Sequence, residues 1–293
     1  MTKWTATDLP DMSGRTVVIT GASGGIGLVT ARELARVGAQ VILAVRNVAK
    51  GEEAAATIPG RTEVRELDVS DLASARRFAA GWTGPIDVLI NNAGIMNVPL
   101  TRTADGFDAQ TATNYFGPFA LTNLLLPHVT DRVVSVASQL HRLGKTRLDD
   151  LTGQNRPYKD MDAYYDSKLN LVLFSTELQR RLTASGSTVR SIIAHPGIAA
   201  TNLVSHTLSG RLMFGTLSFL LNDAEHGALP SLFAATQDIP GNSYVGPSGP
   251  GSVKGHPKIR KPAAAGLDAD TARELWTLTA ELTGTGPQRP TTA

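Results

Sequence analysis

The chain has 293 residues, of which 42% are hydrophobic and 18% charged, with a formal net charge of +2 and no cysteine. This composition predicts a globular protein with a large core, and the lack of cysteine excludes disulfides, thiolate catalysis and cysteine-bound zinc. The balanced charge argues against nucleic-acid binding. The nearest basic stretch, Lys254 to Lys261, is broken by prolines and is expected to be a solvated loop.

Short β-like runs alternate with helical patterns through the first two thirds of the chain. We expect strands at Thr16–Thr20, Gln40–Val45, Glu63–Glu66, Val88–Asn91, Arg132–Ala137, Val189–Ala194 and near Ser243–Val245. We expect helices near Gly25–Val37, Ala49–Ala56, Leu72–Ala80, Phe107–Pro127 and Ala163–Ser185. The alternation predicts an α/β fold: a doubly wound (Rossmann) parallel sheet of about seven strands, with helices on both faces. Ligands bind such sheets in a crevice at the carboxyl ends of the strands.

We find no linker and predict a single domain over residues 1–293, with a core at about 14–246 and a frayed tail from about 283. Two segments should border the crevice, Leu140–Asp162 and Thr201–Asn222. The second contains the apolar run Leu212–Leu221, which suits a lid over an apolar substrate, a core helix or a subunit contact. The run is too short to span a bilayer, and the N-terminus has no signal-like apolar core. We therefore expect a cytoplasmic protein.

A glycine-rich turn lies between the first strand and the first helix, in the run Thr20-Gly21-Ala22-Ser23-Gly24-Gly25-Ile26-Gly27. Glycines let a phosphate approach the backbone closely, and the amides at a helix start attract an anion. The turn lacks the Gly-Lys-Ser/Thr of a P-loop. It therefore predicts a dinucleotide site, with Gly21, Gly25 and Gly27 forming the loop and Ser23 bonding phosphate oxygens.

The end of the second strand determines the expected cofactor. An NAD enzyme would carry an acidic residue there to bind the ribose hydroxyls. This chain instead has Ala44-Val45-Arg46-Asn47. The planar donors of Arg46 suit a 2′-phosphate, so we predict NADP(H). The alternative is that Arg46 is a solvated loop charge.

Further motifs follow in the order of the predicted elements: Asn91-Asn92-Ala93-Gly94, Asn114, Ser138, Tyr164-Tyr165-Asp166-Ser167-Lys168, and Pro196-Gly197 followed by Thr201. Together with the glycine-rich turn, they resemble the short-chain dehydrogenase/reductase family across most of the chain. Within it the chain looks most like the retinol-dehydrogenase-like branch. The segments that carry this likeness are Asp68–Leu72, Asn114–Phe119, Leu121–Leu126, Lys168–Leu171 and the long segment between Ser138 and Tyr164.

Tyr164 and Lys168 are four residues apart, so they share one face of a helix. A phenol with a pKa near 10 is a poor base at neutral pH, and a nearby ammonium would favour the phenolate. The resemblance implies that Tyr164 is the general acid/base, rather than Tyr165, and that Lys168 lowers its pKa and holds the ribose. It also implies that Ser138 orients the substrate carbonyl and that Asn114 supports a water-mediated proton relay.

The resemblance assigns further cofactor contacts beyond the catalytic four. Asp68 and Val69 would hold the adenine ring, while Asn91, Ala93 and Gly94 would line the ribose. The remaining expected contacts are Ile26 in the glycine-rich turn, and Pro196, Gly197 and Thr201 after the sixth strand.

The sequence thus predicts an NADP(H)-dependent oxidoreductase that interconverts a carbonyl and an alcohol on a lipophilic small molecule. A reductase of carbon–carbon double bonds and a non-catalytic NADP(H)-binding sensor or scaffold are the alternatives. The six histidines are scattered, so we expect no metal. The family commonly pairs its two long helices, here Phe107–Pro127 and Ala163–Ser185, so we expect a homodimer or homotetramer.

Overall fold

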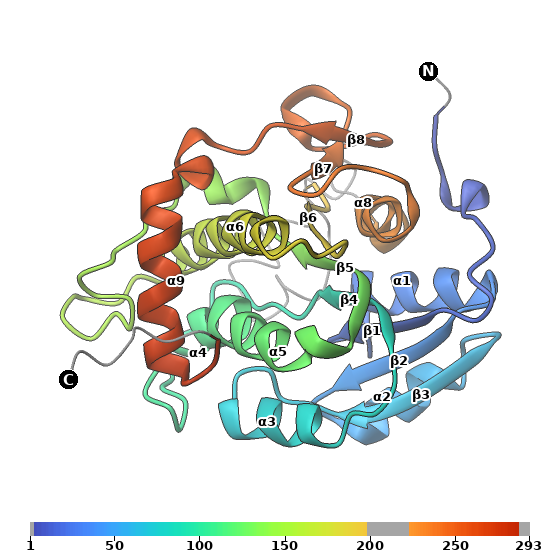
Figure 1. Cartoon of the computed structure of the whole chain (residues 1–293), viewed down its shortest axis with the longest axis horizontal. Coiled ribbons are helices and arrows are strands. Elements are labelled where there is room, and N and C mark those ends of the chain that lie inside the picture. Colours follow the sequence, from blue (N-terminus) through green and yellow to red (C-terminus); the bar gives the residue numbers. More distant parts are fainter. Residues whose placement is uncertain (1–2, 198–222, 287–293) are drawn as a thin grey trace.

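The structure is a computed structural model that describes residues 3–197 and 223–286. An eight-stranded sheet crosses the molecule in the order β3-β2-β1-β4-β5-β6-β7-β8 (Figure 1). Its strands are β1 (Thr16–Thr20), β2 (Gln40–Val45), β3 (Arg61–Glu66), β4 (Ile86–Asn91), β5 (Val129–Val136), β6 (Arg190–Ala194), β7 (Tyr244–Pro247) and β8 (Pro257–Arg260). All neighbours pair in parallel except β7 and β8, which are antiparallel. The strand order reverses between β1 and β4, and the predicted doubly wound fold is confirmed.

Helices cover both faces of the sheet. They are α1 (Gly25–Arg36), α2 (Val48–Ala55), α3 (Leu72–Ala80), α4 (Ala109–Thr111), α5 (Gly117–Leu125), α6 (Asp160–Ala184), α8 (Ala224–Thr236) and α9 (Ala269–Thr283). Alternate strand residues face opposite sides, as the pleat requires. Val17 and Ile19 pack into the core with α1 and α8, whereas Val18 packs into the core that contains α3, α5, α6 and α9.

The predicted helix Phe107–Pro127 is interrupted. Between α4 and α5 lies one turn of π-helix, Ala112–Phe116, in which the Gly117 amide donates to the Ala112 carbonyl. Pro118 follows at the start of α5 and has no N–H for the carbonyl four residues earlier, that of Asn114. The chain accommodates the proline by widening this turn.

The ordered fold continues beyond the expected core boundary at residue 246. The stretch expected to be a solvated loop, Lys254 to Lys261, contains the edge strand β8. Helix α9 then crosses α6 and α5 (Figure 1), where Trp276 stacks on Phe174 at 5.6 Å between ring centroids and meets Phe119 edge-on at 4.9 Å. Helix α9 therefore covers part of the face of α5 and α6 through which we expected two copies to pair.

Candidate active site

The glycine-rich turn joins β1 to α1 at the carboxyl edge of the sheet. Gly21 and Gly25 have φ values of 66° and 54°, which side chains other than glycine rarely adopt. A Cβ on Gly27 would lie 2.5 Å from the Asn92 Nδ2 and 2.6 Å from the Gly21 carbonyl oxygen. No side chain caps the start of α1, and its first turn has no acidic residue. Among the described residues, therefore, no side chain competes with an anion for the amides there.

A network of hydrogen bonds ties this turn to the segment after β4. The Thr20 hydroxyl accepts from the amides of Asn92 (3.0 Å) and Ala93 (2.9 Å). The Asn92 side chain donates to the Thr20 carbonyl oxygen at 2.8 Å. Neither Thr20 nor Asn92 was among the predicted site residues, although both lie inside the quoted motifs. The Asn91 side chain is buried and donates to the Thr122 hydroxyl of α5 at 2.8 Å, so it faces the helix layer.

Arg46 and Asp68 lie at the ends of neighbouring strands, β2 and β3. The Arg46 side chain is 79% exposed, and its Nη1 is 4.0 Å from the Asp68 Oδ2. The other carboxylate oxygen of Asp68 accepts from the Ser70 amide at 2.9 Å. The carbonyl oxygen of Val69 packs directly against Gly117, where a Cβ would have no room. This contact fixes the loop after β3 to the start of α5.

The four predicted catalytic residues come from three elements. Tyr164 and Lys168 lie on α6, each with 4% of its surface exposed, and the Lys168 Nζ is 5.9 Å from the centre of the Tyr164 ring. Lys168 donates to the Val136 carbonyl oxygen at 2.9 Å, at the end of β5. Ser138 lies two residues further, near enough to the Tyr164 phenol to lower its pKa. The end of β5 therefore brings the serine and the lysine anchor to the tyrosine.

Burial dominates the electrostatics of this cluster. It raises the pKa of Tyr164 to about 12, with the hydrogen bond from Ser138 opposing the shift. It lowers the pKa of Lys168 to about 8. We expected the ammonium to lower the pKa of the phenol. In the chain alone desolvation raises that pKa, and the ammonium is not among the groups that lower it. Tyr164 therefore holds its proton at neutral pH.

Asn114 lies on the π-helical turn and is fully buried. Its side-chain oxygen accepts from the Ile95 amide at 2.9 Å, and its Nδ2 donates to the Ile95 carbonyl oxygen (2.9 Å) and the Ser167 hydroxyl (3.0 Å). A Cβ on Gly94 would lie 3.2 Å from the Asn114 Oδ1 and 3.3 Å from the Lys168 Nζ. The structure thus brings Asn114, Gly94 and Lys168 together. Ser167, which connects Asn114 to α6, was missed.

The motif after β6 is described only in part. Gly197 has a φ of 76°, and its amide donates to the Nδ1 of His195 at 3.2 Å. His195 is buried against the Tyr244 ring, and burial lowers its pKa to about 3. Thr201 and the expected lid, residues 201–222, lie outside the described residues.

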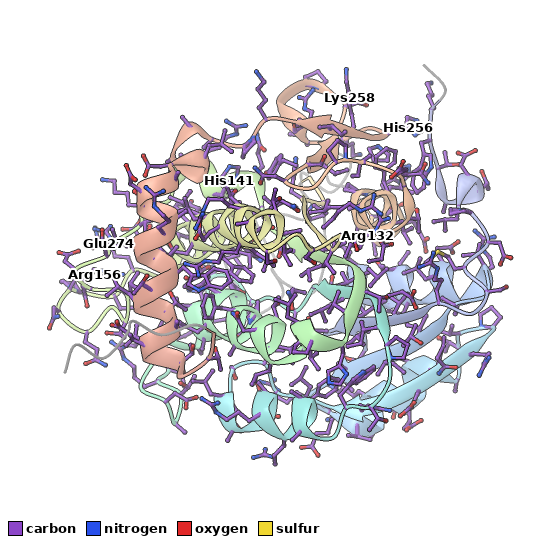
Figure 2. All side chains as sticks on the ribbon, in the orientation of Figure 1. Arg132, His141, Arg156, His256, Lys258 and Glu274 are labelled. Atoms are coloured by element: carbon purple, nitrogen blue, oxygen red, sulfur yellow. The ribbon has the colours of Figure 1, made fainter. Side chains whose placement is uncertain are left out.

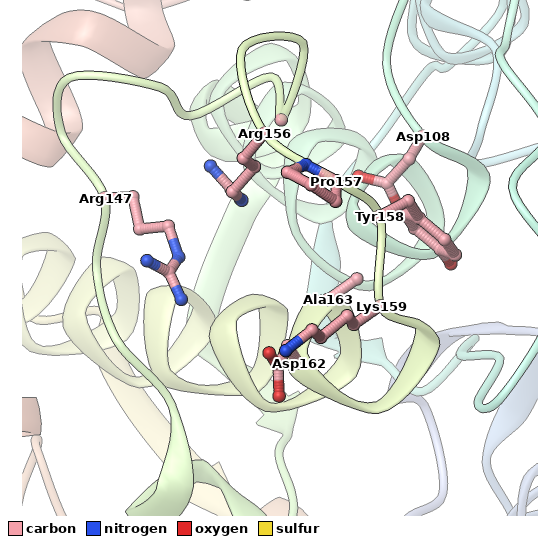
Figure 3. Close-up of a pocket in the computed structure, with 9 residues that line it drawn as sticks. Asp108, Arg147, Arg156, Pro157, Tyr158, Lys159, Asp162 and Ala163 are labelled. Carbon is pink, nitrogen blue, oxygen red and sulfur yellow. The ribbon is translucent and has the colours of Figure 1, made fainter.

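The loop between β5 and α6 encloses a cavity of about 270 Å³ beside the first turn of α6 (Figure 3). Arg147 and Arg156 line it from the loop and Asp108 lines it from the start of α4. Arg147 is held by Asp166 of α6 at 2.9 Å. None of the four predicted catalytic residues is among the lining residues, so this cavity is separate from the catalytic cluster. Tyr165 is half-buried, with its ring 6.4 Å from that of Tyr164.

Within residues 3–197 and 223–286, we find no group of three metal-binding side chains and no helix long and apolar enough to cross a membrane.

The fold and the glycine-rich turn define a dinucleotide-binding α/β protein. Residues 15–211, more than half of the chain, match the short chain dehydrogenase family, and the chain belongs to that family. Its members are oxidoreductases that use NAD(H) or NADP(H).

Within the family, the chain belongs to the retinol-dehydrogenase-like branch. It is 39% identical to retinol dehydrogenase 13 of Homo sapiens, over 92% of this chain and 85% of the relative. It is 45% identical to retinol dehydrogenase 12 of Bos taurus, over 76% and 73%. A solved structure of an uncharacterized protein from Mycobacterium paratuberculosis is 51% identical, with a TM-score of 0.87 over 99% of this chain and 100% of that one.

Proposed function

We propose that this protein is an NADP(H)-dependent oxidoreductase that interconverts a carbonyl and an alcohol on a lipophilic small molecule. The observation that carries the proposal is the meeting of Tyr164, Lys168 and Ser138 at the carboxyl end of β5, beside the open amides of the glycine-rich turn. The three side chains can supply a proton and orient a substrate carbonyl. The amides of the turn can hold a pyrophosphate.

The residues present fit a dinucleotide. The turn at Gly21 and Gly27 is too tight for side chains, which leaves its backbone free to approach phosphates. Lys168 is a buried amine that donates to the Val136 carbonyl, and its ammonium has further protons for ribose hydroxyls. When bound, the nicotinamide supplies or accepts the hydride.

The residues of the chain handle the proton. In carbonyl reduction, Ser138 donates a hydrogen bond to the substrate oxygen and orients it. The Tyr164 phenol, protonated at neutral pH because burial raises its pKa to about 12, transfers its proton to the alkoxide as it forms. Pro118 offers no N–H to the Asn114 carbonyl. This carbonyl holds water that returns a proton through Lys168. In alcohol oxidation the same groups act in reverse.

Arg46 supports NADP(H) as the cofactor. It follows β2 with its guanidinium largely in solvent, and Asn47 caps the start of α2 directly behind it by accepting from the Lys50 amide at 3.0 Å. A 2′-phosphate at this position would meet the guanidinium fork and the positive end of α2.

Two observations support a lipophilic substrate. The two relatives named above are retinol dehydrogenases, and retinol is a lipophilic alcohol. The segment that follows Gly197, residues 201–222, contains the apolar run Leu212–Leu221. We propose that aldehydes and ketones with large apolar groups are preferred over small polar ones.

The test is NADPH oxidation by the purified protein with a panel of aldehydes and ketones, including retinal, with Tyr164→Phe as the control. Turnover that is lost in the variant, with an alcohol as product, supports the proposal. A saturated carbonyl formed from an α,β-unsaturated one would assign alkene reduction instead. Tight NADPH binding with no turnover of any substrate would favour a cofactor-binding role.

We also propose that the protein forms a homo-oligomer, in which copies meet outside the area that α9 covers. The Trp276 side chain packs against Phe119 of α5 and Phe174 of α6, and the Arg181 guanidinium lies 4.4 Å from its ring centre. Light scattering during size-exclusion chromatography gives the molar mass directly. A mass equal to that of one 31.0 kDa chain would contradict the oligomer.

A further inference from the structure

His141 is a fully buried histidine three residues after Ser138, on the 3₁₀ helix η4 (Gln139–Leu143). It lies beside α6, under the segment that runs from β8 to α9 (Figure 2). Its Nδ1 is 2.7 Å from the Ser138 carbonyl oxygen, and its own amide donates to the same oxygen at 3.1 Å. The Ser138 carbonyl oxygen therefore has two hydrogen-bond contacts with His141, one with its side chain and one with its backbone amide.

The other ring nitrogen determines the tautomer. The His141 Nε2 is 2.9 Å from the Ala263 amide, which can only donate. Nε2 must therefore accept and carry no proton, so Nδ1 carries it and donates to Ser138. Burial lowers the pKa of His141, which keeps the ring neutral. The Tyr244 hydroxyl faces the ring, 3.3 Å from Nδ1, and the buried His195 stacks on the Tyr244 ring. The charge of the neighbouring Arg142 also lowers the pKa of His141.

Ala263 belongs to the segment after β8, outside residues 15–211 that match the family. The neighbouring Arg142 binds the same segment, because its Nη2 donates to the Lys261 carbonyl oxygen at 2.7 Å. Two consecutive residues of η4, His141 and Arg142, thus form hydrogen bonds with the backbone of residues 261–263. Ser138 itself caps η4 by accepting from the Leu140 amide at 3.2 Å. A displacement of η4 therefore moves the serine.

We propose that His141 is a positioning residue: it connects the backbone of the C-terminal segment at Ala263 to Ser138 and fixes the serine hydroxyl toward Tyr164. The proposal rests on the function assigned above, in which Ser138 orients the substrate carbonyl. The C-terminal segment at residues 261–263 would then help to position the active site, although it is far from Ser138 and Tyr164 in the sequence.

The first test breaks the hydrogen bond from the Ala263 amide. Ala263 has a φ of −62°, which proline adopts without strain, so the backbone accepts Ala263→Pro. The substitution deletes the donor, and the ring Cδ that replaces the hydrogen also forces the His141 Nε2 away from its position 2.9 Å from the Ala263 nitrogen. Ala264→Pro is the matched control, because Ala264 begins the 3₁₀ helix η8 (Ala264–Leu267), where proline is tolerated. We expect Ala263→Pro to lower kcat roughly tenfold, the usual worth of one hydrogen bond, with KM and NADPH affinity unchanged. Equal kcat in the two variants would overturn the proposal.

The second test separates the two ring nitrogens. An asparagine at position 141 places its amide where Nδ1 lies and can still donate to Ser138, whereas a glutamine reaches the position of Nε2. We expect His141→Asn to retain more kcat than His141→Gln, at matched thermal stability. If both variants lose kcat in proportion to their lost stability, His141 has only a structural role.

A measurement that does not depend on turnover tests the role of His141 separately from the proposed function. Amide hydrogen exchange over residues 138–144 should accelerate in Ala263→Pro but not in Ala264→Pro. If it does not, the link between Ala263 and Ser138 is wrong whether or not the enzyme has found its substrate. If exchange responds while the wild-type protein turns over nothing, the proposed function fails and the link stands.

Discussion

The two ends of the crevice differ in how they handle charge. At the end of β2, Arg46 is 79% exposed and its carboxylate partner Asp68 is 4.0 Å away and partly solvated. At the end of β5, Tyr164 and Lys168 are each 4% exposed, and burial moves the pKa of both. Solvent screens the charges at the end of β2, whereas the groups at the end of β5 are shielded from solvent. We therefore expect substitutions at the buried end to have large effects that depend on pH, and those at the open end to have small effects that depend on salt.

The largest effect is expected for Tyr164→Phe, which removes the proton donor and keeps the ring. Turnover should fall by roughly 10²–10⁴, the usual contribution of general acid catalysis. NADPH affinity, measured by fluorescence titration, should stay nearly unchanged. Tyr165→Phe is the matched control on the same helix. Full activity in Tyr164→Phe would show that another group donates the proton.

Lys168 should make stability depend on pH. Its pKa falls from 10.5 to about 8 on folding, so between these values the unfolded chain binds more protons. The free energy of unfolding should therefore rise as the pH increases from 8 to 10.5, by up to about 3 kcal/mol. Urea titrations of the cofactor-free protein at several pH values measure it.

Lys168→Met should lack this rise, and Lys50→Met, at an exposed position on α2, should keep it. An identical pH dependence in wild type and Lys168→Met would mean that the buried amine does not change its pKa on folding.

Arg46→Ala should act only on cofactor choice. We expect kcat/KM for NADPH to fall about tenfold, a typical size for one charge-assisted contact, while the value for NADH stays constant. The loss should shrink at high salt because the site is solvated. Arg77→Ala, with a side chain that is 70% exposed and paired with Asp71, is the control. Equal losses with both cofactors would assign Arg46 a role other than phosphate recognition.

The smallest effect is expected for the pair between Arg46 and Asp68. An exposed pair at 4.0 Å contributes little, so Asp68→Asn should change the free energy of unfolding by less than about 1 kcal/mol. Asparagine can still accept from the Ser70 amide. A larger loss in urea denaturation would mean that the open end is less solvated than its exposure indicates.

The sequence was most informative where strands are buried on both faces. The bounds of β1 and β2 were predicted to the residue, since their continuous apolar runs end at polar or glycine-containing turns. Helix α8 was missed because Pro230 lies inside it and it is apolar on all sides. Helix α9 had signals that could have revealed it: Asp268 caps its start by accepting from the Thr271 amide, and Gly284 ends it in the left-handed conformation.

Within the site, the motifs predicted which residues lie close together, but not the hydrogen bonds that fix their positions. Tyr164, Lys168 and Ser138 were placed together by the order of the elements. The contacts of Thr20 with Asn92, of Asn114 with Ser167, and of His141 with Ala263 depend on tertiary packing over long sequence separations. No local pattern indicates such partners. The desolvation that sets the pKa of Tyr164 likewise arises only when the helices close around it.

The π-helical turn at Ala112–Phe116 contains one residue more than an α-helical path between the same ends would need. Deleting one residue from this turn would bring it to α-helical spacing, although Pro118 still has no N–H to offer, and would rotate everything before it by about 100° relative to α5. Asn114 would then leave the side of the helix that faces Ile95 and Ser167. The length of this turn is thus a geometric requirement of the site, and a homologue that is one residue shorter here would need another way to place the amide.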